Sequence, residues 1–204
     1  MRILIIDFET TTPKGRPPEP IEVGVVVGDV DWHGGGVILK RFEEFINPPS
    51  YAPLTYLDTS QTGITSRDLD RARDAVGVLR DVDRLITGVD YIVAHNASVE
   101  AGVLSRYAEA CPLLGVSDVL CSLRLARAVI PGLKSHSLDS LSHHFGIPIP
   151  QGRHRALADV ELTFVVFERL LEGMNVLSEY SRTITMSNAV LKSKTTMNDQ
   201  LELF

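Results

Sequence analysis

Apolar residues near the start of the chain form short runs that are typical of β-strands. Residues 3–6 are an uninterrupted run, residues 23–27 form a second, and residues 37–46 alternate in part before the breaker Asn47-Pro48-Pro49. An uninterrupted run is typical of a central strand buried on both faces. We expect Asp7 at the exposed end of the first strand. Three consecutive strands with short connections predict an antiparallel meander.

The pattern changes after this meander, where helical and strand patterns alternate. Residues 67–86 carry apolar side chains at close to helical spacing, and a Pro/Gly loop around residue 150 precedes the strongest helical pattern of the chain. We expect helices over 67–86, 99–108, 122–129, 137–145 and 156–172, and strands over 91–94 and 116–120. The chain is therefore predicted to be an α/β protein.

The last residues have a different character. From about Ser187 the apolar pattern gives way to a polar stretch, and it returns as Gln200-Leu201-Glu202-Leu203-Phe204. We predict one domain over residues 1–185 and a flexible tail over residues 186–204.

Composition narrows the classes of protein to which the chain can belong. With 204 residues, 44% of them apolar, it can bury one substantial core. Asp7 and Glu9 exclude a signal peptide or a membrane span at the start, and two cysteines without metal-type spacing fit a reducing cytoplasm. The formal net charge of −6 argues against a protein that coats nucleic acid through a general basic surface. A nucleic-acid enzyme stays open, because divalent cations in a carboxylate site attract phosphate.

Asp7 and Glu9 are the first candidates for chemistry. Residues two apart in a strand point to the same face, so both carboxylates would project from one strand end. Such paired oxygen ligands suit Mg²⁺ or Mn²⁺. Taken alone, the pair is also explained as two solvated carboxylates.

Two later segments supply further candidates. His154 and Asp159 lie five positions apart, about 140° of helical rotation, so we expect the helix to begin after His154 and to carry Asp159 in its first turns. Glu100 lies at the start of another helix, directly after a buried strand. An acidic residue at a helix N-terminus is also favoured by the helix dipole alone, so neither segment decides the function by itself.

In combination, these segments resemble the DEDDh branch of the DnaQ-like 3′-5′ exonucleases. The first family motif is similar to Asp-Phe-Glu-Thr at residues 7–10, the second to residues 94–100 and the third to residues 154–159. Four further segments also resemble sequences of this family, at residues 46–48, 62–65, 123–127 and 136–141. The resemblance runs from about Arg2 to Leu171. It implies a ribonuclease H-like α/β fold with a mixed five-stranded sheet, three antiparallel strands followed by two parallel ones, flanked by helices.

The resemblance also implies roles for named residues. Asp7, Glu9 and Asp159 would hold two Mg²⁺ or Mn²⁺ ions, Glu100 would complete the metal site, and His154 would be the general base. Two such ions stabilise the attacking and leaving oxygens at phosphorus, and a neutral histidine accepts the proton of the attacking water. The sequence departs from the family at Val99-Glu100, where Phe-Asp is usual, which makes reduced activity or a different metal preference an open alternative.

Contacts with substrate and partners are also implied. The terminal nucleotide would lie against residues beside the first motif and around the Thr-Gly segment, namely Phe8, Thr10, Thr62, Gly63, Ile64 and Asn96. Phosphates would contact Arg124, Arg127 and Lys134, although a solvated helix face explains these cations as well.

The C-terminal peptide resembles a different class of sequence, a short partner-binding motif. Gln200, Leu201, Leu203 and Phe204 resemble the peptide by which bacterial replication and repair proteins bind the β sliding clamp, an extended segment with apolar side chains for a groove. The alternative is that an apolar end folds back on the domain.

The function predicted is a two-metal-dependent 3′-5′ exonuclease that hydrolyses DNA to nucleoside 5′-monophosphates. We expect a freestanding, clamp-tethered enzyme of repair or proofreading that acts on single-stranded or frayed 3′ ends of DNA, in the cytoplasm and without a membrane partner. The alternatives are an RNA 3′-5′ exonuclease and a catalytically impaired, clamp-tethered protein that binds DNA ends.

Overall fold

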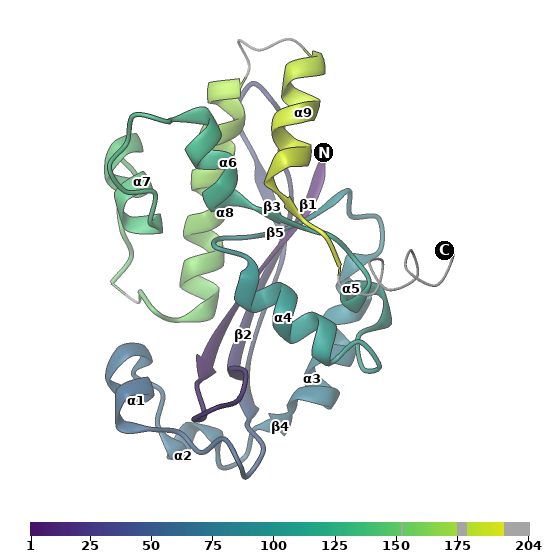
Figure 1. Ribbon diagram of the computed structural model, residues 1–204, viewed down its shortest axis with the longest axis vertical. Coiled ribbons are helices and arrows are strands. Elements are labelled where there is room, and N and C mark those ends of the chain that lie inside the picture. Colours follow the sequence, from purple (N-terminus) through teal and green to yellow (C-terminus); the bar gives the residue numbers. More distant parts are fainter. Residues whose placement is uncertain (152, 175–178, 194–204) are drawn as a thin grey trace.

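A mixed seven-stranded sheet lies at the centre of the computed structural model, which describes residues 1–151, 153–174 and 179–193 (Figure 1). The strand order is β4-β3-β2-β1-β5-β6-β7. The strands are β1 (Arg2–Thr11), β2 (Glu19–Asp29), β3 (Val37–Asn47), β4 (Arg73–Asp74), β5 (Tyr91–Ala94), β6 (Val119–Cys121) and β7 (Val190–Leu191).

The pairing confirms the predicted meander and adds two edge strands to it. β1, β2 and β3 pair antiparallel, and β5 and β6 continue the sheet in parallel on the other side of β1. β4 pairs parallel with β3, and β7 pairs antiparallel with β6. The expected five-stranded sheet omitted β4 and β7, because a two-residue strand has no alternation that a sequence pattern can reveal.

The helices expected over 99–108, 122–129, 137–145 and 156–172 are confirmed, whereas the region 56–86 differs and the helices over 112–115 and 179–189 were not predicted. The helices of the structure are α1 (Tyr56–Thr62), α2 (Ser66–Leu69), α3 (Ala75–Asp83), the 3₁₀ helix η1 (Arg84–Ile86), α4 (Ser98–Arg106), α5 (Pro112–Gly115), α6 (Ser122–Val129), α7 (Leu138–Phe145), α8 (Ala156–Met174) and α9 (Glu179–Ala189). The continuous helix expected over 67–86 is wrong. Asp74 caps a new helix by accepting a hydrogen bond from the Gly77 N–H at 2.8 Å, while β4 pairs with the end of β3.

Helices cover both faces of the sheet (Figure 1). Side chains alternate along β1, so that Leu4, Ile6 and Phe8 pack against α3, α4 and α5, whereas Ile3 and Ile5 pack against α6 to α9. Burying one such aliphatic side chain contributes about 1.5–3 kcal/mol. Because β1 is covered on both faces, its position is fixed, and so is that of the polar residues at its carboxyl end.

The folded region extends beyond the expected boundary at residue 185. Met186 and Ala189 of α9 are buried in the core on the α8 side, and β7 then pairs with β6. The polar residues of α9 obscured its apolar face in the sequence. The predicted clamp-binding peptide, residues 200–204, lies outside the described residues.

Two further features bear on the class of protein. Within the described residues, no helix is long and apolar enough to cross a membrane. Cys111 and Cys121 are buried free thiols, and burial raises the pKa of the Cys111 thiol to about 12.

Candidate active site

Strand β1 carries two of the predicted carboxylates. Asp7 was expected at the end of β1, but β1 continues to Thr11 because β2 pairs with it further on, placing Asp7 opposite Gly24 and Glu9 opposite Glu22. Both acidic side chains are partly buried. Their alternation along β1 puts them on the face covered by α8.

The start of α8 brings two more predicted residues to this place. α8 begins at Ala156, so Asp159 lies in its first turn and His154 in the loop before it, as the rotation argument predicted. His154 has a φ of 63°, a left-handed conformation that few residues other than glycine adopt. One ligand atom from each of Glu9, His154 and Asp159 lies within 4.8 Å of the other two. The three side chains are close enough to act on one ion or water.

Glu100 is the buried member of the group. It lies in the first turn of α4 and is only 4% exposed. The backbone N–H groups of Phe8 and of Glu100 itself lower the pKa of its carboxyl, but Oε2 has no hydrogen-bond partner among the described residues. A buried carboxylate oxygen without a partner is costly unless something else binds it.

The carboxylates hold their protons tightly because they are buried together. Burial raises the pKa of Asp7 well above its usual range, and Glu100, Glu9 and Asp159 raise it further by repulsion. Burial followed by repulsion from Asp159 and Glu22 raises the pKa of Glu9 to about 7. Burial raises the pKa of Glu100 to about 8. The group therefore favours either protons or cations at neutral pH.

Arg153 provides one positive charge in this group. Its guanidinium contacts Asp159 and donates to Asp139 Oδ1 at 2.7 Å. The same guanidinium lowers the pKa of Asp7 and of Glu9. One arginine offsets only part of the charge of the carboxylates.

Strand β2 fixes where α8 begins. Glu22 is fully buried, accepts from Arg155 Nε at 3.0 Å, and accepts through its other oxygen from the Ala156 N–H at 2.9 Å. A Cβ placed on Gly24 would lie 2.3 Å from the Ala156 carbonyl carbon. The first turn of α8 thus rests directly on β2, and this contact sets the position of Asp159.

Three of the six predicted substrate contacts have buried side chains. Phe8 and Ile64 are 5% and 2% exposed in separate apolar clusters. The Thr62 hydroxyl donates to Asp58 O at 2.9 Å and accepts from the Ile64 N–H at 3.1 Å. These side chains therefore pack within the protein.

The other three residues are not fully buried. Thr10 is partly buried, and Gly63 is an exposed helix cap with a φ of 72° and nothing within 4 Å of the place of a Cβ. Asn96 has a φ of 59°, which asparagine tolerates better than most residues, and lines a cavity with Asp7. These positions remain open to a ligand.

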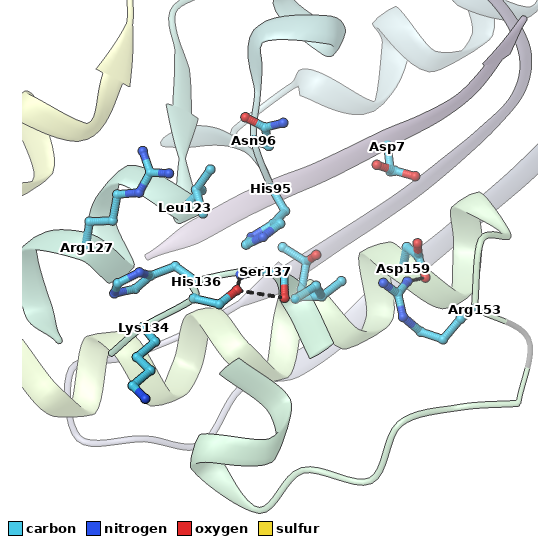
Figure 2. A pocket seen from close by; sticks show the side chains of 13 residues that line it. Asp7, His95, Asn96, Leu123, Arg127, Lys134, His136, Ser137, Arg153 and Asp159 are labelled. Carbon is cyan, nitrogen blue, oxygen red and sulfur yellow. Dashed lines mark hydrogen bonds and ion pairs between the residues drawn. The ribbon is translucent and has the colours of Figure 1, made fainter. Parts of the chain in front are cut away.

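The site opens into a cavity of about 580 Å³ (Figure 2). Asp7, Arg153 and Asp159 lie at one end, His95 and Asn96 lie in the middle, and Arg127, Lys134 and His136 lie at the other end (Figure 2). His95 Nδ1 is 2.9 Å from Ser122 Oγ, and burial together with Arg153 lowers the pKa of His95 to about 4. His95 is therefore a neutral polar group in the wall of the cavity.

Three residues of the site were not predicted from the sequence, namely Glu22, His95 and Arg153. The sequence could have indicated Glu22, because a charged residue inside the apolar run 21–27 requires a partner if the strand is buried. Arg153 directly precedes His154, but its contacts with Asp139 and Asp159 depend on the fold. His95 had no signal apart from its place in the second motif.

Several known proteins are similar to this chain. The model of the RNase_T family, described as exonuclease, matches residues 4–167. DNA polymerase III PolC-type of Bacillus subtilis (strain 168) is 35% identical over 198 residues, which is 94% of this chain and 13% of that protein. The 3′-5′ exonuclease DinG of the same organism is 31% identical over 179 residues, 86% of this chain and 18% of that protein. The chain thus spans less than a fifth of the length of either relative.

A solved structure shows the same fold. The nuclease domain of 3′hExo, described as a DEDDh family member and bound to rAMP, matches with a TM-score of 0.70 at 22% identity. The match covers 84% of this chain and 92% of that chain.

Proposed function

Because this chain belongs to the RNase_T family of exonucleases and is of the DEDDh type, with a ribonuclease H-like fold, we propose that it hydrolyses DNA from the 3′ end with two divalent ions. Membership of this family indicates that the chain hydrolyses nucleic acid as a 3′-5′ exonuclease. DNA as the substrate and the two ions are the proposal.

The observation that carries the proposal is the cluster of Asp7, Glu9, Glu100 and Asp159. The cluster draws these residues from β1, α4 and α8 and raises the pKa of the first three. Carboxylates in such proximity are ionised together only beside cations. The unpartnered Glu100 Oε2 and the short spacing of Glu9 to Asp159 fit hard cations. These four residues would hold Mg²⁺ or Mn²⁺.

The side chains of this chain have separate tasks in the reaction. When bound, two divalent ions stabilise the attacking and leaving oxygens of an in-line displacement at phosphorus. His154, exposed on its loop and beside Glu9 and Asp159, accepts the proton of the attacking water. The neighbouring carboxylates stabilise the imidazolium that forms. The water oxygen bonds to phosphorus, the bond to the 3′ oxygen breaks, and that oxygen takes up a proton, leaving a shorter strand and a nucleoside 5′-monophosphate.

DNA is the favoured substrate for two reasons. The relative with 35% identity is named as a DNA polymerase, and the C-terminal sequence resembles a peptide that binds a clamp on DNA. RNA is the alternative, because the 3′hExo structure is described as bound to rAMP.

The choice between DNA and RNA is tested with one sequence made in both forms. Each strand carries a 5′ label and is incubated with Mg²⁺ or with Mn²⁺, and the products are resolved at single-nucleotide resolution. We expect faster stepwise shortening of DNA. Faster shortening of RNA would transfer the function to RNA processing.

The position of Glu100 favours an active enzyme over an impaired DNA-end binder. Glu100 reaches the carboxylate cluster and raises the pKa of Asp7 by repulsion, although Val99 stands where the family usually has an aromatic residue. The longer side chain therefore still brings its charge to the site.

We propose further that Gln200, Leu201, Leu203 and Phe204 bind the β sliding clamp and tether the enzyme on DNA. The support is the sequence match alone. A peptide of this size binds weakly, and its effect comes from raising the local concentration of the enzyme. Loss of binding to immobilised clamp on deletion of residues 200–204 is expected, and unchanged binding would refute the tether.

A further inference from the structure

The end of the active-site cavity that lies away from the carboxylates has no task in the proposed reaction. Arg127 on α6 and Lys134 on the loop after α6 line this end, whereas Asp7 and Asp159 line the other (Figure 2). A second hollow of about 170 Å³ is lined by Arg124 and Arg127, and it shares Asn96, Leu123 and Arg127 with the large cavity. The two hollows adjoin at these three residues, and we call them together the α6 groove.

The cations of the α6 groove are free to bind a ligand. Arg124, Arg127 and Lys134 are exposed, and no ion pair or hydrogen bond joins their side chains to any described residue. By contrast, Arg153 and Arg155 are paired with carboxylates. Three unpaired cations gathered along one groove are notable in a chain with a formal net charge of −6.

The backbone that carries these cations is held in place. Arg124 and Arg127 are three apart on α6 and so lie on one face of the helix. His136 Nε2 is 2.9 Å from Ile130 O, which closes the loop that carries Lys134. Ser137 then caps α7 by accepting from the Ser140 N–H at 3.3 Å. The groove is therefore formed before any ligand binds.

The groove leads to the carboxylate cluster over a neutral surface. His95 and Asn96 lie between the two ends (Figure 2). His95 Nδ1 is near Ser122 Oγ, and its Nε2 has no partner among the described residues. An anionic chain that reaches from the cations to the carboxylates thus meets polar, uncharged groups on the way.

We propose that the α6 groove binds the substrate strand through the phosphates on the 5′ side of the scissile phosphate. Cations that track a backbone are the usual way to bind a single strand without reading its sequence. These cations also offset the repulsion between the substrate and the carboxylate cluster. The inference rests on the proposed function, because it places the cleaved 3′ end at Asp7 and Asp159.

The test compares Arg127→Gln/Lys134→Gln with a matched control, Arg80→Gln. Arg80 is exposed on α3, on the opposite face of the sheet, and no ion pair joins it to a described residue. Substrates are a dinucleotide without a 5′ phosphate, which has no phosphate on the 5′ side of the scissile one, and an octanucleotide of single-stranded DNA. Binding of the labelled octanucleotide is measured in parallel by fluorescence anisotropy, in an Asp7→Asn background that does not cleave it.

The double variant is expected to raise the KM and the dissociation constant of the octanucleotide roughly five- to tenfold. The KM for the dinucleotide is expected to stay unchanged. The salt dependence of octanucleotide binding is expected to fall by about one to two counterions. Arg80→Gln is expected to change none of these. Unchanged octanucleotide binding, or an equal loss for the dinucleotide, would overturn the groove while leaving the exonuclease intact. A wild-type enzyme that binds the octanucleotide through these cations but cleaves no DNA would instead refute the proposed function alone.

Discussion

Glu22 of β2 and Arg155, the residue before α8, form a two-pronged ion pair across 133 positions of the sequence. The buried Glu22 carboxylate accepts from Arg155 Nε at 3.0 Å and from Nη2 at 2.5 Å, and its second oxygen also accepts from the Ala156 N–H. His154 directly precedes Arg155, and Asp159 lies one turn further along. This pair therefore fixes the segment that carries His154, the proposed general base, and Asp159.

Glu22→Gln is expected to destabilise the protein and to slow the reaction. The amide keeps the shape but removes the charge opposite Arg155, which costs roughly 2 kcal/mol for a partly exposed partner. Urea unfolding measures this loss. Glu43→Gln is the control, because Glu43 lies 3.7 Å from the same guanidinium but at the surface, where an ion pair is worth about 0–1 kcal/mol. Equal effects of the two substitutions would contradict the role given to Glu22.

Gly24→Ala is expected to damage the site through backbone packing. The added Cβ would meet the Ala156 carbonyl carbon at 2.3 Å, and forcing α8 away from β2 costs about 3 kcal/mol or more. Gly132→Ala is the matched control, since nothing lies within 4 Å of its Cβ. Thermal unfolding and circular dichroism distinguish the two variants. A Gly24→Ala protein as stable as Gly132→Ala would show that the contact is not tight in solution.

Stability without metal is expected to fall as the pH rises through about 7 to 8. The pKa of Glu9 is about 7 and that of Glu100 about 8 in the folded chain, against 4.5 in the usual range. The folded state therefore holds protons that the unfolded chain releases, so the stabilisation is present at low pH and lost above these values. Mg²⁺ competes with the protons, and we expect it to raise Tm more near pH 9 than near pH 6. The same shift of Tm at both values would be inconsistent with the raised pKa values.

Glu100→Gln is expected to separate stability from activity. It keeps an acceptor for the Phe8 N–H but removes the buried charge, so the metal-free variant should be more stable than wild type above about pH 8. Its activity should fall by roughly 10–100-fold, because one carboxylate of the metal site is lost. Glu100→Asp is the companion variant, and it should keep more activity than Glu100→Gln. Full activity of Glu100→Gln would remove Glu100 from the site.

The sequence predicts the central part of this fold better than its edges. The apolar runs that became β1, β2 and β5 are largely buried, so their pattern carries the signal. β4 and β7 have two residues each, and only pairing with a neighbouring strand makes them strands. The helix expected over 67–86 failed because the capping bond from Gly77 to Asp74 outweighs a helical pattern that continues through it.

Some residues of the candidate site could likewise be predicted from the sequence, whereas others depend on the fold. Asp7, Glu9, Glu100, His154 and Asp159 each have an ordinary explanation in isolation, and only their combined resemblance to the DEDDh motifs predicts a shared site. Arg153 could not be found from its sequence context, because its pairing with Asp139 and Asp159 brings two helices together. The burial of the Phe8 and Ile64 side chains also depends on the fold and could not be predicted from their place beside the motifs.

The most direct test of the central claim is the shortening of a 5′-labelled single-stranded DNA by wild type and by Asp7→Asn. Each is incubated with Mg²⁺, with Mn²⁺ or with EDTA, and the products are separated on a sequencing gel. Wild type with either metal should give a ladder that shortens from the 3′ end by one nucleotide at a time and releases nucleoside 5′-monophosphates. EDTA or Asp7→Asn should abolish the ladder, because the carboxylate cluster can then no longer hold its ions. An Asp7→Asn ladder at the wild-type rate, or no wild-type ladder with any metal, would contradict the account.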